Sequence, residues 1–124
     1  MSGKSKIFNS DFQIKHSYQT RLEQSGNVLR KYPERVPVII EKAKGSKIAA
    51  YDKIRYLVPG ELTITQLLFV LRKRIMLASE QSIFIIVEDG TLVPANWTMS
   101  QVYHRYKNPD GFLYMNYMGE NVFG

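Results

Sequence analysis

The chain ends on Phe123-Gly124, and a C-terminal glycine is a candidate for acyl chemistry. A glycine carboxylate has no side chain beside it, so it can enter a narrow enzyme channel. Ordinary residue frequencies also place glycine at chain ends by chance. Residue type alone therefore leaves two interpretations open, a reactive acyl group and an arbitrary end.

Other reactive groups are missing or scattered. The chain has no cysteine, which excludes disulfides, thiolate metal sites and a cysteine nucleophile. His16 and His104 are far apart, and neither has a metal-ligand spacing. No phosphate loop, nucleophile elbow or close carboxylate pair is present. We therefore expect a protein that is not an enzyme and that uses no metal or cofactor.

The composition predicts acidic partners. The 124 residues carry 17 Lys and Arg against 11 Asp and Glu, a formal charge of +6. Such a surface suits acidic peptides, anionic membranes or nucleic acid. Nucleic acid is the weakest of these options, because no binding motif accompanies the charge. We expect a cytoplasmic protein, since no apolar run could span a bilayer and no secretory signal begins the chain.

The elements that would position the terminal glycine form one domain. Helical spacing predicts a helix over 18–31 that Pro33 ends, and its apolar side chains share one face. A short helical turn is predicted over 11–16. β-branched runs predict strands over 35–42 and 54–58.

Strand alternation within the second of these strands separates its side chains. It places Arg55 and Leu57 on one face and Tyr56 and Val58 on the other.

Two capping boxes mark the helices of the second half. Thr63 and Gln66 open a long central helix, and Thr98 and Gln101 open a shorter one. The central helix carries an apolar stripe, with Phe69 and Val70 outside it and partly exposed. A buried strand is predicted over 83–87, a hairpin into Leu92-Val93, and a last strand over 112–117.

This order of elements predicts an α+β fold of the β-grasp type. A four-stranded mixed sheet would carry the central helix on one face and the N-terminal helices on the other. The last strand is expected to lie inside the sheet and pair with the first. We expect a flexible N-terminal extension over 1–10, a domain over 11–117, and a flexible tail over 118–124.

Several separated motifs resemble the lipid-conjugated ubiquitin-like autophagy modifiers, the GABARAP-like proteins. They are KYPERVPVIIEK at 31–42, DKIRYLVP at 52–59, RKRI at 72–75, DGFLY at 110–114, and the final Phe123-Gly124. The resemblance covers residues 18–124 with one insertion near Asp89–Thr91. It implies a ubiquitin-like core with two extra N-terminal helices, in agreement with the order of elements.

The resemblance also implies a function for the tail. Gly124 would form thioesters with activating and conjugating enzymes and then pass to phosphatidylethanolamine on autophagosomal membranes. The catalytic residues would belong to those partners, and this chain would be a monomeric modifier that is cytoplasmic until it is lipidated. Two alternatives stay open: a peptide-binding adaptor that is never conjugated, and a modifier joined to protein lysines.

A second implied activity is capture of acidic aromatic-x-x-aliphatic motifs of cargo receptors and adaptors by strand addition. By residue-by-residue match, the pocket for the aromatic residue would consist of Val28, Pro37, Ile39, Arg55, Leu57 and Phe112. The pocket for the aliphatic residue would consist of Arg35, Tyr56, Val58, Pro59, Leu62, Leu67 and Val70.

Four positions depart from the family pattern. Gln24 stands where a glutamate is common, Val28 replaces a larger aliphatic residue, and Leu67 replaces an aromatic one. Arg55 replaces the usual lysine, which keeps the charge and adds a fork that can pair bidentately with a carboxylate.

Overall fold

The structure is a computed structural model that describes residues 10–78 and 81–119. Two helices, α2 (Asp11–Lys15) and α3 (Tyr18–Lys31), precede strands β1 (Arg35–Lys42) and β2 (Arg55–Pro59). Helix α4 (Ile64–Arg74), strand β3 (Phe84–Val87), helix α5 (Met99–Tyr106) and strand β4 (Leu113–Met118) follow. Each predicted helix and strand of the main order is present.

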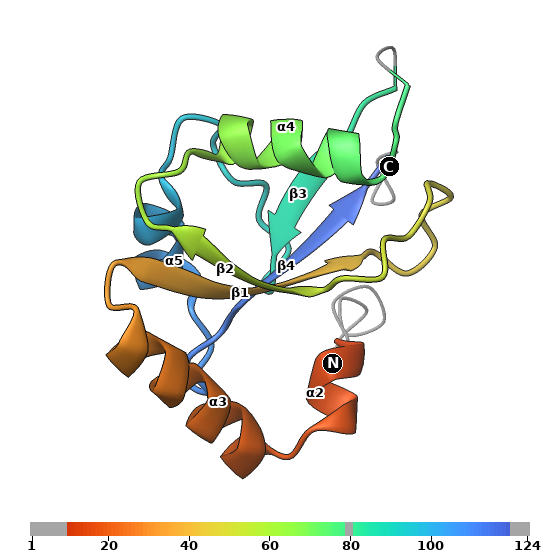
Figure 1. Cartoon of the computed structure of the whole chain (residues 1–124). Coiled ribbons are helices and arrows are strands. Elements are labelled where there is room, and N and C mark those ends of the chain that lie inside the picture. The colour runs from red at the N-terminus through yellow and green to blue at the C-terminus, as the bar shows by residue number, and fades with distance from the viewer. Residues whose placement is uncertain (1–9, 79–80, 120–124) are drawn as a thin grey trace.

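The four strands form one mixed sheet in the order β2-β1-β4-β3. β1 pairs antiparallel with β2 and parallel with β4, and β4 pairs antiparallel with β3. The last strand therefore lies inside the sheet beside the first, as predicted. Figure 1 shows α4 across one face of the sheet and α2 and α3 on the other, which confirms the predicted α+β arrangement.

Alternation along the strands divides the core between the two faces. Leu113, Met115 and Tyr117 of β4 pack with Leu67 and Leu71 of α4 in the main core. On the opposite face a smaller cluster joins four buried side chains, Phe12, Ile39, Phe112 and Tyr114. Aromatic rings of α2 and β4 meet there, with the Phe12 and Phe112 centroids 5.3 Å apart.

The helices begin where their caps predict. Thr63 and Thr98 both form complete capping boxes, in which the threonine hydroxyl and the glutamine amide satisfy each other's backbone N–H groups. Ser10 and Ser17 cap α2 and α3 by accepting from backbone N–H groups. Local hydrogen bonding therefore defines these helix starts.

Helix α3 packs through a polar face. Its apolar side chains share a face at helical spacing, but Tyr18 and Leu22 on that face are exposed, and Ser25 is the only buried residue of this fully described helix. The helix docks through polar contacts of Arg21 and Ser25, so an apolar period does not identify its inner face.

Strand ends also differ slightly from prediction. β2 begins at Arg55 instead of Ile54, and β4 runs through Met118, so the described domain extends past 117. The predicted hairpin into Leu92-Val93 is reduced to one bridge between Ile86 and Leu92. Pro94 follows at once and lacks the N–H that a longer ladder needs.

Pro37 occupies an inner strand without losing a ladder hydrogen bond. The pairing of β1 with β4 starts one residue later, at Val38 opposite Leu113. On the other side, Val38 lies opposite Tyr56 and Val36 opposite Val58. Pro37 therefore belongs to the start of the strand, where its missing N–H has no β4 partner to lose.

Candidate functional site

A cavity of about 430 Å³ lies between helix α3 and the edge strand β2. Three elements and the residue before β4 supply its walls. The lining residues are Gln24, Asn27, Val28, Pro37, Lys53, Arg55, Tyr56, Leu57 and Phe112. Its floor is apolar and its rim is cationic, and no carboxylate occurs among these described residues. The cavity can therefore receive an apolar side chain that has acidic neighbours.

The rim is ordered by hydrogen bonds between α3 and β2. Arg55 Nη1 donates to Gln24 Oε1 at 2.6 Å. Lys53 Nζ lies 5.2 Å from the centroid of the Tyr56 ring, and the Tyr56 hydroxyl donates to the Lys53 carbonyl. Burial raises the pKa of Tyr56 to about 12, so the hydroxyl remains a donor at neutral pH. Gln24 holds Arg55 in place without neutralising its charge.

The structure brings together five of the six residues predicted for the aromatic pocket. Val28, Pro37, Arg55, Leu57 and Phe112 all line the cavity.

The sixth residue, Ile39, does not line this cavity and is fully buried in the core cluster that contains Phe112. Its neighbour Val38 points into the main core, and strict alternation turns Ile39 to the other face, where α2 covers it.

The residues predicted for the aliphatic pocket surround the β2 and α4 side of the sheet. Val58 and Leu67 are buried in the main core, and Tyr56 and Leu62 pack against that core. Val70 is partly exposed on α4, as predicted, and Arg35 and Pro59 are exposed at paired ends of β1 and β2. Tyr56 also lines the first cavity.

Backbone groups at the edge of the sheet are the second part of the site. The Ile40 N–H donates to the Ile54 carbonyl at 2.8 Å, so residues 54, 56 and 58 point their polar groups toward β1. In an antiparallel pair the groups of the alternate residues, Arg55 and Leu57, then point away from the sheet. The Leu57 carbonyl accepts from Arg35 Nη1 at 3.3 Å, which agrees with that direction.

Three lining residues, Gln24, Asn27 and Lys53, were absent from the two predicted pocket sets, although Gln24 was noted as a departure from the family pattern. Asn27 lies three positions after Gln24 on α3, and Lys53 two positions before Arg55. Helical spacing places Asn27 beside Gln24, and strand spacing places Lys53 on the same side as Arg55. These two spacings could have identified Asn27 and Lys53 from the sequence.

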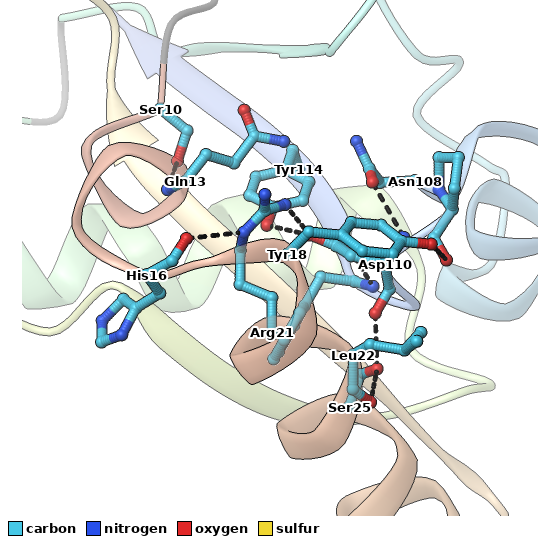
Figure 2. Close-up of polar contacts among 12 residues, drawn as sticks. Ser10, Gln13, His16, Tyr18, Arg21, Leu22, Ser25, Asn108, Asp110 and Tyr114 are labelled. Carbon is cyan, nitrogen blue, oxygen red and sulfur yellow. Dashed lines mark hydrogen bonds and ion pairs between the residues drawn. The ribbon is translucent and has the colours of Figure 1, made fainter.

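A buried polar network holds α3 in position beside the cavity. Figure 2 shows Arg21 and Ser25 of α3, Asp110 of the turn before β4, and Tyr114 of β4 converging. The Asp110 carboxylate, fully buried, accepts from Arg21 Nη1 and from the Tyr114 hydroxyl at 2.5 Å each. Its second oxygen accepts from the Phe112 N–H at 2.8 Å, and the Ser25 hydroxyl donates to the Asp110 carbonyl.

These contacts shift the pKa values of Arg21 and Tyr114. Burial alone lowers the pKa of Arg21, but its hydrogen bonds to Asp110 and Tyr114 raise it above the ordinary value. Burial and the Asp110 carboxylate raise the pKa of Tyr114 far above the value of a free tyrosine. Arg21 and Asp110 therefore pair as ions beside a neutral phenol.

Stability should fall in alkaline solution because of buried tyrosines. Burial raises the pKa values of Tyr56, Tyr103, Tyr114 and Tyr117 in the folded state. The unfolded state releases these protons near pH 10, before the folded state does. The contribution of these tyrosines to the free energy of unfolding should therefore be constant up to about pH 10. It should fall as the pH rises from there toward about 12.

Urea midpoints measured across this range, with tyrosinate absorbance in parallel, test the expectation. Tyr56→Phe should reduce the slope. A midpoint that does not change with pH would contradict the assignment.

Metal sites and membrane-spanning helices are two features that can be searched for in the described residues. No group of three His, Cys, Asp or Glu side chains among residues 10–78 and 81–119 could hold a metal ion. Every helix in the same range is too short or too polar to cross a bilayer. Gly124, the predicted lipid-conjugation residue, lies outside the described residues, as do most positions of the two segments predicted to be flexible.

The sheet order, the helix across one face and the added N-terminal helices define a ubiquitin-like protein. A family model described as "Autophagy protein Atg8 ubiquitin like" matches residues 20–124. The chain belongs to this Atg8 family.

Similar proteins agree over nearly the whole chain. Autophagy-related protein 8c of Arabidopsis thaliana is 47% identical over 116 residues, which are 94% of this chain and 97% of that protein. Autophagy-related protein 8 of Candida glabrata is 49% identical over 115 residues, 93% of this chain and 97% of that protein. The crystal structure of Trypanosoma brucei ATG8 superposes with a TM-score of 0.85 at 38% identity, covering 93% and 98% of the two chains.

Proposed function

We propose that this protein is a ubiquitin-like autophagy modifier with two activities. It is joined through Gly124 to phosphatidylethanolamine on autophagosomal membranes, and it recruits cargo receptors and adaptors through acidic aromatic-x-x-aliphatic motifs. The observation that carries the recruitment is the cation-rimmed apolar cavity beside the outward backbone groups of β2. The family membership and the terminal Phe123-Gly124 support the conjugation.

Conjugation uses the chain as an acyl donor. ATP first converts the Gly124 carboxylate to an acyl adenylate with loss of pyrophosphate. The thiolate of the activating enzyme displaces AMP to form a thioester, and the thiolate of the conjugating enzyme then takes over the acyl group and releases the first thiolate. The lipid amine then attacks the thioester carbonyl, the amide bond forms, and the C–S bond breaks with loss of the thiolate. This chain has no cysteine, so in this scheme the catalytic thiols belong to the activating and conjugating enzymes, and the chain serves as the modifier that they transfer. Once attached, the lipid anchors it by about 0.8 kcal/mol per buried methylene.

Motif capture extends the sheet by one strand. An extended peptide pairs with the outward N–H and carbonyl groups of Arg55 and Leu57. The hydrogen bond from Arg35 to the Leu57 carbonyl then breaks, or the carbonyl accepts from both Arg35 and the peptide. The aromatic side chain enters the cavity against Val28 and Leu57. The aliphatic side chain, three positions further along the peptide, points to the opposite face of the added strand and lies toward the α4 side of β2. Lys53 and Arg55 hold the acidic neighbours.

Deletion of Gly124 should abolish attachment to membranes. The full chain is incubated with activating and conjugating enzymes, ATP and liposomes that contain phosphatidylethanolamine. It should move into the floating membrane fraction, whereas the deletion variant should stay in solution because it lacks the acyl group that the enzymes recognise. Asn121→Ala, which changes the tail but keeps the glycine, serves as the control and should still move.

Other outcomes identify the alternatives. Motif binding without any thioester would indicate a non-conjugated adaptor, and adducts on protein lysines in place of lipid would indicate a protein modifier. Absence of a shift under conditions in which an Atg8 relative is lipidated contradicts the proposal.

A further inference from the structure

The C-terminal end of β4 lies against the connection between β1 and β2. Parallel neighbours end at the same edge of a sheet, so β1 and β4 finish side by side. The β1–β2 connection starts at that edge, and Figure 1 shows it beside the end of β4. Gly119, the described residue that follows β4, therefore lies beside this connection.

Gly119, directly after β4, fits against Ile48 with no space for a side chain. A Cβ at position 119 would lie 1.9 Å from Ile48 Cγ2 and 3.3 Å from Ile48 Cβ. The Gly119 N–H donates to the buried Ser46 hydroxyl at 3.2 Å. Steric contact with Ile48, and not an unusual backbone angle, is therefore what requires glycine here.

The connection is itself held firmly. The Ala43 N–H donates to the Tyr117 carbonyl at 2.8 Å, and Lys42 Nζ donates to the Ser46 carbonyl at 2.7 Å. The Tyr117 hydroxyl accepts from the Tyr51 N–H at 3.0 Å. Ile48 packs against the main core, so rotation away from Gly119 would remove it from that packing. The contact between Ile48 and Gly119 thus joins two ordered segments.

We propose that Ser46, Ile48, Tyr117 and Gly119 form a tail clamp that sets the direction in which the C-terminal residues leave the sheet. Gly124 is five residues beyond Gly119, an arm that reaches at most about 18 Å. A change of direction at the base of so short an arm displaces the acyl carbon at its tip. Gly119 is a positioning residue for the acyl group, an inference that rests on the proposed conjugation.

A distance measurement tests the tail clamp without any enzyme. The chain has no cysteine, so Glu61→Cys and Asn121→Cys allow two spin labels to be placed uniquely. In this background Gly119→Ala should shift and broaden the distance distribution, because the methyl group forces Ile48 and the chain apart. Adding Ile48→Ala removes Cγ2 and should restore the parent distribution. Adding Ile48→Val keeps both γ-carbons, Cγ2 included, and should not restore it.

Thermal unfolding of each variant confirms that it is folded. If Gly119→Ala fails to fold, Ser46→Ala replaces it as the test, because loss of the acceptor for the Gly119 N–H should also broaden the distribution. Distributions identical to the parent in every folded variant would overturn the tail clamp. The tail clamp would also be overturned if Ile48→Val restored the parent distance distribution of the Gly119→Ala chain as fully as Ile48→Ala does.

Thioester formation on the activating enzyme supplies the second readout. Gly119→Ala should lower kcat by about tenfold or more with KM unchanged, since ~1 Å of misplacement can cost ~100-fold. Ile48→Ala in the same chain should restore kcat. A wild-type chain that forms no thioester would refute the proposed conjugation, and the label distances would still decide the tail clamp. A normal kcat for Gly119→Ala would show that the tail clamp does not position the acyl group.

Discussion

Replacement of Asp110 by alanine is expected to lower the free energy of unfolding by about 3–5 kcal/mol, the usual cost of breaking a buried ion pair. The Asp110 carboxylate is fully buried, and the Arg21 side chain that pairs with it is only 13% exposed. Alanine would leave that guanidinium without its partner, and it would also remove the acceptors of the Tyr114 hydroxyl and the Phe112 N–H. No water replaces them cheaply at such depth.

Urea unfolding of the two proteins at neutral pH measures this effect. Asp110→Asn should fall between wild type and Asp110→Ala, because the amide oxygen still accepts but the charge is lost. Asp11→Ala is the matched control: Asp11 pairs with Lys44 at 2.9 Å, but both side chains are at least half exposed. Its cost should remain below about 1 kcal/mol. Equal losses at the two aspartates would contradict the role assigned to the buried network.

Replacement of Leu57 by aspartate is expected to weaken binding of an acidic aromatic-x-x-aliphatic peptide by at least ~30-fold, about 2 kcal/mol. Leu57 forms part of the cavity wall, and its backbone groups lie at the open edge of β2. An aspartate there puts a carboxylate against the incoming aromatic ring and repels the acidic neighbours. Leu57 is half-buried on an edge strand, so the fold should tolerate the change.

Calorimetric titration of the peptide into each variant gives the affinity. Leu92→Asp introduces the same charge at an exposed leucine bridged to β3, the opposite edge strand, and should bind like wild type. Thioester formation should be nearly unchanged in both, because neither position belongs to the tail. An unaltered affinity for Leu57→Asp would show that the peptide docks elsewhere.

The cavity and the polar network are connected parts of one arrangement. Asp110 organises the turn before β4, because its N–H donates to the Asn108 side chain and its carboxylate accepts from the Phe112 N–H. The second contact orients Phe112, which forms part of the cavity wall. Arg21 and Ser25 fasten α3 to that turn, and α3 carries Val28 and Gln24 into the opposite wall. Variants of Asp110 should therefore also weaken peptide binding, as a consequence of a displaced α3.

Local patterns predicted much of this protein because they act over a few residues. The capping boxes of Thr63 and Thr98 need only the glutamine three positions later, and both form as the sequence indicates. Alternation in β2 correctly separated Leu57 from Val58. The order of elements indicated the β-grasp arrangement, and the motifs that resemble the autophagy modifiers supported it.

Such local patterns did not predict contacts between residues that are far apart in the sequence. Arg21 and Asp110 are 89 positions apart, and Gly119 and Ser46 are 73 apart, so only the folded chain makes them neighbours. Packing against α2 buries Ile39 away from the cavity, and polar docking leaves Tyr18 and Leu22 of α3 exposed. A residue's type and spacing determine which helix or strand it joins, but its burial depends on which other element covers it, and that is a property of the assembled fold.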